Sequence, residues 1–553
     1  MASDPGRILA GQKWCRTSVS GEPPRLDRFR NRRRFQSSTL NVTGISLTAV
    51  SAGLLACTLL EALSSDRDTA ALFAATLLVG ATGALLWCFT EPGTLRMRQI
   101  FATVGWTWML TTLLGAAPYV LAGTFAVSGA GFVEQVVNSV FESASGFSCT
   151  GATVMTDFDN AGSGLMMYRQ LTQWYGGMGV VVLAVAVLPF LGVGGLELIS
   201  AEAPGTSSDR LTPRVSETAR RLWVVYAGFT VLSAAALFAA DGFASLYDAV
   251  AHALTAASTG GFSPHPDSIG HYDSAVVETV VIVLMILGGT SFSLHWRALA
   301  TRGLPYWRNS EFRSYLFVLG VFSLGVVALL WLDDGMAFVS ALRAGFFNVV
   351  SLGTSTGFGN AAGSATAGDY VTWVAGAQLL LLFLMVVGGC SGSTAGGIKV
   401  MRMRVLGLLM VRSVRKTQTP HLVMPVRLGR DVIAESVVAR VAGFFLLHFL
   451  MMIAGLLTVT ALGGELEASL GAVVSALGNM GPALGEAGPT ASYAEAFSLP
   501  ARLVLALLMI VGRLEILPIL LAFVPHVYRA QALRRVSIGS QELPIYRIRF
   551  SVT

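Results

Sequence analysis

Apolar windows of about twenty residues recur along almost the whole chain. An α-helix needs about this length to cross roughly 30 Å of hydrocarbon at 1.5 Å per residue. Of the 553 residues, 53% are hydrophobic and only 13% are charged, so little of the chain remains for a large soluble domain. We therefore predict an all-α integral membrane protein with about ten spans. The predicted spans lie near residues 43–63, 69–90, 99–122, 170–192, 218–240, 275–296, 313–332, 370–389, 436–462 and 500–524.

Four further apolar segments are too short to cross the bilayer, and each ends in a small-residue turn. One lies between the third and fourth spans, one between the fifth and sixth, one between the seventh and eighth, and one between the ninth and tenth, near residues 133–147, 245–257, 338–352 and 467–478. The turns read "SGFSCTGATV", "TAASTGGFSP", "GTSTGFGNA" and "ALGNMGPALG". Aligning Gly151, Gly260, Gly357 and Gly481 gives separations of 260−151=109, 357−260=97 and 481−357=124. A unit of about a hundred residues, consisting of a span, a re-entrant half-span, a glycine turn and a span, therefore occurs four times.

Turns of this kind at membrane depth have a physical requirement. Non-helical backbone is tolerated there only where it is buried in protein or lines a water-filled path. Four such turns around one axis would place main-chain carbonyls where they replace the hydration water of an ion. The half-spans would point their partly negative C-termini at this site, which favours cations. The alternative is that the small residues only let helices pack closely.

Basic residues occupy alternate loops between the predicted spans. Arginines and lysines gather near 96–98, 210–221, 297–313, 399–416 and 529–535, and the intervening loops are acidic or neutral. This is the positive-inside pattern, and it predicts that both termini are cytoplasmic. We therefore interpret the basic residues behind the net charge of +6 as those that set the orientation of the protein in the membrane, and not as a surface that binds nucleic acid. Residues 1–40 are expected to form a disordered basic cytoplasmic arm, with lipid binding as the alternative.

No pattern indicates catalysis, a metal site or a cofactor in this chain. The five cysteines include no CxxC pair, and the seven histidines show no ligand spacing. Cys149 and Cys390 lie in turns but have no histidine or acid at a motif-like spacing, so they are interpreted as small buried residues.

The chain resembles a known family through several longer motifs. "STGFGN" resembles the potassium filter of the TVGYG type. The stretches "LTQWYGGMGVVVLAVAVLPFLGVGG" at 171–195, "GGTSFSLHWRAL" at 288–299, "GGCSGSTAGGIKVMR" at 388–402 and "GRLEILPILL" at 512–521 are more specific. Together they resemble the TrkH-like branch of the Trk/Ktr potassium-uptake superfamily, over about residues 40–530.

The resemblance implies an extra two-helix unit and four pore units around a central pore. The units would cover residues 41–92, 93–205, 206–305, 306–425 and 426–530, with a cytoplasmic tail at 531–553. It also implies a homodimer in the bacterial inner membrane, gated by a cytosolic nucleotide-binding subunit of the TrkA type, with the nucleotide on that partner. Potassium would be held in a selectivity filter formed by Thr150, Gly151, Thr259, Gly260, Thr356, Gly357, Asn479 and Gly481. Asn479 and Met480 make the fourth turn different, while Gly151 favours potassium, because sodium-preferring relatives carry serine there.

The stretch 388–400 interrupts an apolar helix, and the resemblance makes it an intramembrane gating loop. The gating residues would be Gly392, Ser393, Thr394, Gly396, Gly397, Lys399 and Arg513. A simple kink and phosphate binding are alternatives, although no GxxxxGK[ST] pattern is present. A charge inside a span must face the bundle interior or the pore, which applies to Arg513. The resemblance implies that Arg513 lies against this loop, with pairing to Glu515 as the alternative.

Two further charged features are interpreted more simply. Arg169, near the outer end of its span, is expected to snorkel or to pair with Asp157 or Asp159. The basic loops at 399–416 and 427–430 are candidates for docking the cytosolic partner, with plain positive-inside bias as the alternative.

The predicted function is passive, channel-like potassium uptake driven by the membrane potential, with no enzymatic activity. The rival is a proton- or sodium-coupled symporter that works by alternating access. Such a transporter would need a titratable residue at mid-span, and the candidates are Glu278 and Glu515.

Overall fold

A computed structural model describes most of the chain, in twelve stretches and one isolated residue. The described residues are 35–64, 67–91, 97–126, 131–191, 212–240, 245–301, 303–361, 367–419, 421, 423–428, 431–524, 535–538 and 541–544. Of the basic arm predicted over residues 1–40, residues 1–34 lie outside the described residues. Much of the tail predicted over residues 531–553 also lies outside them.

The described chain is mostly helical, as expected. Its strands form three short pairs. β1 (Phe35–Gln36) pairs in parallel with β2 (Thr90–Glu91), while β3 (Arg427–Leu428) with β4 (Asp431–Val432) and β5 (Arg535–Ile538) with β6 (Gln541–Pro544) are antiparallel.

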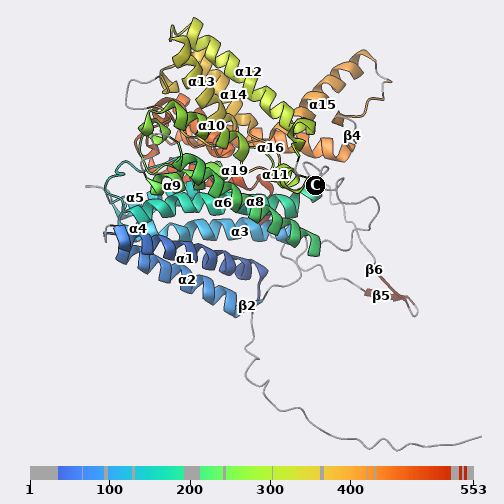
Figure 1. Cartoon of the computed structure of the whole chain (residues 1–553). Coiled ribbons are helices and arrows are strands. Elements are labelled where there is room, and N and C mark those ends of the chain that lie inside the picture. The colour runs from blue at the N-terminus through green and yellow to red at the C-terminus, as the bar shows by residue number, and fades with distance from the viewer. Residues whose placement is uncertain are drawn as a thin grey trace, which may run out of the picture.

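The first two long helices form a separate pair at one side of the molecule (Figure 1). α1 (Ser38–Ser64) and α2 (Thr69–Phe89) pack on each other, and α1 also packs on α3 (Met97–Gly115) and α6 (Ser163–Leu191). Glu61 of α1 is fully buried, and Gly164 N at the start of α6 donates a 2.6 Å hydrogen bond to its carboxylate. This contact fixes the helix pair against the rest of the protein, because an anionic group is stabilised at a helix N-terminus.

The remaining helices repeat one order four times. In each round a long helix is followed by a short helix, a non-helical turn and a further helix. The short helices are α5 (Phe132–Phe147), α9 (Leu246–Ser258), α13 (Phe338–Gly353) and α17 (Leu466–Gly478). The long helices that precede them are α3, α8 (Thr212–Phe238), α12 (Ser310–Leu332) and α16 (Glu435–Ala461), with the short α4 (Ala117–Ala122) after α3.

The helices after the turns differ from one another. α6 is continuous, whereas α10 (Ala275–Gly288) and α11 (Phe292–Thr301) meet at a bend of 95°. α14 (Ala375–Val387) and α15 (Val400–Gln418) are separated by the non-helical residues 388–399. α19 (Leu499–Arg513) and α20 (Leu517–Ala522) are separated by residues 514–516. Short helices complete the connections, namely η2 (Ser268–Tyr272), η3 (Pro305–Arg308), η4 (Tyr370–Thr372), η5 (Gly485–Ala487) and α18 (Tyr493–Ala496).

These breaks explain part of the difference between the span count and the sequence expectation; the window predicted near 170–192 falls on the continuous α6, which is not among the spans counted below. Within the described residues, six helices are long and apolar enough to cross a membrane, or seven if α10 and α11 count as one span. The windows predicted near 370–389 and 500–524 fall on the shorter α14 and α19. A hydropathy window measures apolar length and does not detect a break in the helix, so ten spans remain a prediction.

The repeated helices close on themselves. The helix that follows each turn packs on the short helix of the next round: α6 on α9, α10 on α13, α14 on α17, and α19 on α5. α20 also packs on α3, which joins the last round to the first. The turns are therefore brought together at the centre by helices far apart in the sequence.

Large apolar side chains remain exposed on the outer helices. Only 17% of the apolar window of α16 is buried, and Leu446, Leu450 and Leu457 are among its exposed residues. Exposed apolar surface on this scale is expected where a helix faces lipid.

Candidate functional site

The four turns share one backbone conformation. Each short helix is followed by a residue with positive φ and, two positions later, by a glycine with positive φ. These pairs are Cys149 (54°) and Gly151 (91°), Thr259 (49°) and Gly261 (78°), Ser355 (55°) and Gly357 (81°), and Asn479 (53°) and Gly481 (94°). We call them the first to fourth turns. In each turn the residue between the pair donates its N–H to the carbonyl five residues earlier, at 2.9 or 3.0 Å.

The second turn corrects the alignment made from the sequence. Gly261, and not Gly260, has the positive φ that Gly151, Gly357 and Gly481 have. The separations become 261−151=110 and 357−261=96. The sequence contains two adjacent glycines at this point, and identity alone cannot choose between them. Gly260 therefore corresponds to Thr150, Thr356 and Met480, and Thr259 corresponds to Cys149.

The four turns touch in cyclic order and form a ring. A Cβ placed on Gly151 would lie 2.2 Å from Gly260 O, and one on Gly261 would lie 2.1 Å from Thr356 O. A Cβ on Gly357 would lie 1.8 Å from Met480 O, and one on Gly481 would lie 2.7 Å from Thr150 O. Glycine is required at these four positions because the next turn's backbone occupies the space of a side chain. The sequence-predicted filter residues are thus brought together.

The carbonyl groups of this ring differ in their hydrogen bonds. Thr150, Thr356 and Met480 are fully buried, and no described residue donates a hydrogen bond to their main-chain oxygens. Gly260 O accepts one, from Gln173 Nε2 at 2.7 Å. Buried carbonyls without a protein donor are rare in proteins, because each loses its hydrogen bonds to water. Three such oxygens in one ring form a site for a cation or for water.

The fourth turn holds one of its carbonyls away from any ligand. Gly481 O accepts hydrogen bonds from Ser475 Oγ at 2.9 Å and from Tyr493 OH at 2.7 Å. Both lone pairs of this oxygen are therefore used by the protein. The ring is not fourfold symmetric in its chemistry.

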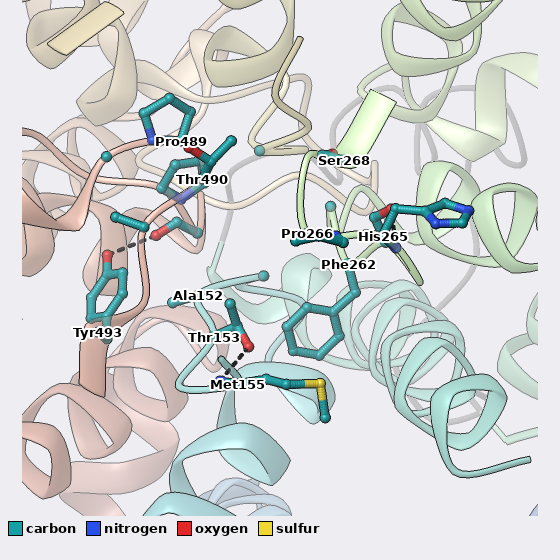
Figure 2. Close-up of a pocket in the computed structure, with 18 of the residues that line it drawn as sticks. Ala152, Thr153, Met155, Phe262, His265, Pro266, Ser268, Pro489, Thr490 and Tyr493 are labelled. Carbon is teal, nitrogen blue, oxygen red and sulfur yellow. Dashed lines mark hydrogen bonds between the residues drawn. The ribbon is translucent and has the colours of Figure 1, made fainter. Parts of the chain in front are cut away.

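A cavity of about 60 Å³ lies on the side of the residues that follow the turns. Figure 2 shows the side chains of Phe262, Met155, Thr153 and Tyr493 around it, from several different segments of the chain. Arg169 also lines this cavity.

The expectation that Arg169 snorkels or pairs with Asp157 or Asp159 is wrong. It is 2% exposed, and its Nε lies 2.6 Å from Glu142 Oε1, because α6 carries it inward against α5.

Glu142 marks a position that the sequence reading did not identify. It lies nine residues before the glycine of its turn (151−142=9), as His252 (261−252=9) and Asn348 (357−348=9) do in theirs. Each bonds to the chain just after its own turn: Glu142 to Thr153 Oγ1 at 2.9 Å, His252 Nε2 to Ser263 Oγ at 3.0 Å, and Asn348 Nδ2 to Asn360 Oδ1 at 2.9 Å. A polar residue nine positions before the glycine is the signal that could have found these three, once the second turn is correctly aligned; the fourth turn has Ala472 at this position (481−472=9).

The predicted gating segment lies directly against the turns on the side of the short helices. Thr394 Oγ1 accepts a hydrogen bond from Thr259 Oγ1 at 3.2 Å, and Gly396 N donates to Ser355 Oγ at 2.5 Å. A Cβ on Gly396 would lie 3.0 Å from Asn479 Cβ. The segment therefore contacts the second, third and fourth turns. Gly392 and Gly397 have positive φ, as the bends of this non-helical stretch require.

Arg513 connects the same segment to the first turn. Its Nη1 donates a 2.6 Å hydrogen bond to Thr394 O, and its Nη2 donates one of 3.1 Å to Cys149 Sγ. The alternative partner, Glu515, instead lies 2.6 Å from Arg402 Nη2. Cys149 was interpreted from the sequence only as a small buried residue, and its contact with Arg513 is a role that the structure adds.

A second cavity, of about 30 Å³, lies beneath the fourth turn. Lys399, Arg402 and Arg513 line it together with Glu515 and Asn479. The Nζ of Lys399 bonds to Ala395 O. Three positive side chains and one negative one therefore border this cavity, and an excess of positive charge opposes the passage of cations. The gating roles of these residues remain predictions.

Comparison with known proteins identifies close relatives over most of the chain. Residues 69–529 match the family model "TrkH: Cation transport protein". The Trk system potassium uptake protein TrkH of Halomonas elongata is 37% identical over 495 residues, covering 89% of this chain and 98% of that protein. The TrkH of Escherichia coli K12 is 34% identical over 456 residues, covering 81% and 90%. The crystal structure of the potassium transporter TrkH from Vibrio parahaemolyticus superposes with a TM-score of 0.79 at 31% identity, covering 89% and 99%.

Proposed function

Because this chain belongs to the TrkH family of cation transport proteins, we propose that it takes up potassium across the cytoplasmic membrane of a bacterium through a channel-like pore. The ring of four turns would be the selectivity filter, with main-chain oxygens replacing the hydration shell of the ion. The potassium uptake relatives support the substrate. A negative-inside potential supplies about 2.3 kcal/mol per charge per 100 mV, which drives uptake without a catalytic site.

One observation carries this proposal: the three buried carbonyl oxygens of Thr150, Thr356 and Met480, to which no described residue donates. An ion or a chain of waters is the natural partner for such groups. The four short helices end at the ring, so their partly negative C-termini favour a cation over an anion there. Packing of small residues alone would leave these oxygens without any partner.

We place the gate at residues 388–400 together with Arg513. This segment contacts three turns directly and the first turn through Arg513, so it occupies the path on one side of the ring. A cytosolic nucleotide-binding subunit of the TrkA type would move it. The basic residues of α15, among them Arg412, Arg415 and Lys416, follow this segment and would dock that subunit on the cytoplasmic side. A homodimer with a pore in each protomer and cytoplasmic termini completes the proposal.

The rival function is a proton- or sodium-coupled symporter. The titratable residues named for it are already paired, Glu278 with Arg343 and Glu515 with Arg402, so neither is a free carboxylate in the path. This favours the channel-like pore.

Flux through the purified protein in liposomes distinguishes the two functions. Rubidium, potassium and sodium uptake are measured under an imposed voltage, with and without a proton or sodium gradient. We expect voltage to suffice for potassium and rubidium uptake. A requirement for either gradient would establish the symporter instead.

A further inference from the structure

Helix α6 of the first round holds the second turn through a glutamine. Gln173 is fully buried, and its Nε2 donates a 2.7 Å hydrogen bond to Gly260 O. Its Oε1 accepts a 3.1 Å hydrogen bond from Phe262 N. One side-chain amide therefore bonds to main-chain groups on both sides of Gly261, the glycine with positive φ. A bidentate contact of this kind fixes the position of the turn as well as its orientation.

Arg169, one helical turn before Gln173 on α6, bonds to the same segment a little further on. Its Nη1 donates a 2.8 Å hydrogen bond to Ser263 O, and its guanidinium lies 3.6 Å from the centroid of the Phe262 ring. Its charge is balanced by Glu142, which also accepts hydrogen bonds from Thr153 Oγ1 and from Val154 N after the first turn. The ion pair thus connects the chain after the first turn to the chain after the second.

These contacts act on an oxygen of the ring itself. Gly260 O corresponds to the main-chain oxygens of Thr150, Thr356 and Met480, and it alone among these four accepts a hydrogen bond from a described residue. Gly260 O also lies close to the first turn, because a Cβ placed on Gly151 would be only 2.2 Å from it. Gln173 therefore determines how far the second turn stands from the first.

We propose that Gln173, supported by Arg169, is a positioning residue that sets the preference for potassium over sodium. The inference rests on the proposed function of the ring as a filter. Discrimination between two ions of equal charge depends on the number and placement of the oxygens that replace water. With Gln173 in place, Gly260 O is held at a fixed point and does not move inward to meet the smaller sodium ion. Without this amide, the second turn is free to follow either ion.

The test compares two glutamines on the same helix. Gln170 is also fully buried on α6, but neither of its amide atoms has a hydrogen-bond partner in the part of the chain that the structure describes. Purified Gln173→Leu and Gln170→Leu are reconstituted in liposomes, and the potassium-to-sodium flux ratio is measured under an imposed voltage. We expect the ratio to fall about tenfold in Gln173→Leu, the size of effect that follows the loss of a buried hydrogen bond. In Gln170→Leu it should stay at the wild-type value.

A second variant separates positioning from simple destabilisation. In Gln173→Glu the shape is kept, and a protonated carboxyl can still donate to Gly260 O and accept from Phe262 N, whereas an ionised carboxylate has no donor. We expect the flux ratio of this variant to recover as the pH falls from 8 to 5.5, with no such recovery in the wild type. This readout also decides the question if Gln173→Leu fails to fold.

The two proposals fail in different ways. If the wild-type protein shows no potassium flux, the proposed function is wrong. If the wild type is selective and folded Gln173→Leu keeps the same ratio, or Gln173→Glu shows no dependence on pH, the positioning role of Gln173 is wrong while the filter stands.

Discussion

Gly357 lies so close to Met480 that a Cβ on the glycine would be 1.8 Å from the main-chain oxygen of Met480. The two residues are 123 positions apart (480−357=123), and they belong to the third and fourth turns of the ring. Gly357 also has a φ of 81°, which costs a residue with a side chain about 1–2 kcal/mol. Conformation and contact therefore both require glycine at this position.

Gly357→Ala should reduce potassium flux in liposomes at least about tenfold. The positive φ alone costs an alanine about 1–2 kcal/mol, about 1.4 kcal/mol corresponds to a factor of ten, and the clash with Met480 O adds to this cost. Rubidium uptake and gel filtration of the same preparation measure activity and folding. Gly359→Ala is the matched control, since a Cβ there would meet its nearest atom at 3.4 Å and φ is not positive. Wild-type flux in Gly357→Ala would contradict the assignment of the ring as the ion path.

Arg513→Gln should increase potassium flux about tenfold in the absence of any cytosolic partner. The substitution removes a charge-assisted hydrogen bond to Thr394 O, a contact of about 1.5–3 kcal/mol, and it removes a positive charge beside the path. Voltage-driven rubidium uptake measures the change. Arg415→Gln, an exposed arginine on α15, is the control and should conduct as the wild type does. Lower or unchanged flux in a stable Arg513→Gln protein would exclude the gating role.

Glu142→Ala should destabilise the protein by about 3–5 kcal/mol, because it leaves Arg169 buried without its counter-charge. Thermal unfolding in detergent measures the loss. Glu217→Ala removes an exposed partner of Arg221 and should change stability by no more than about 0.5 kcal/mol. The double variant Glu142→Gln/Arg169→Met should recover part of the lost stability. If Glu142→Ala and the double variant are both as stable as Glu217→Ala, the ion pair is not important for stability.

Acid should weaken the loop that contains His271. Its ring stacks on that of His265 with centroids 3.8 Å apart, and His265 Nε2 lies 3.1 Å from Asp248 Oδ1. Desolvation, followed by the charge of His265, lowers the pKa of His271 from its usual value near 6.5, although Asp248 and Asp267 act in the opposite direction. A base with a lowered pKa in the folded state binds fewer protons than in the unfolded state. The contribution of His271 to the stability of the folded protein is therefore fully present above about pH 6.5 and is lost as the pH falls below that value.

The measurement is the melting temperature of wild type, His271→Gln and His421→Gln between pH 7.5 and 5. His271→Gln should lose less stability on acidification than the wild type does. His421 is exposed elsewhere on the chain, and His421→Gln should keep the wild-type dependence on pH. An identical slope in His271→Gln would show that the stacked pair does not contribute to acid sensitivity.

Local features of the sequence were sufficient to find the short helices and the turns. The predicted half-spans near 133–147, 245–257, 338–352 and 467–478 correspond to α5, α9, α13 and α17, with ends that agree within one residue. Apolar length and the clustering of glycine, serine and threonine are properties of consecutive residues, so they can be read without the fold. The breaks after α14 and α19 and the bend between α10 and α11 were only partly visible, because hydropathy is the same on both sides of a break.

Which residues meet was decided by the tertiary structure. The choice of Gly261 over Gly260 depends on φ, which packing against Thr356 enforces. The pairing of Arg169 with Glu142, the contact of Arg513 with Cys149 and the bonds from Gln173 to the second turn all join residues at least 27 positions apart in the chain. The sequence by itself determined that four glycine turns each follow a short apolar segment, because backbone flexibility and apolar length are local. Only the fold decided which neighbour each turn touches, because a buried charge or carbonyl is satisfied by whatever group the packing of distant helices brings within hydrogen-bond distance.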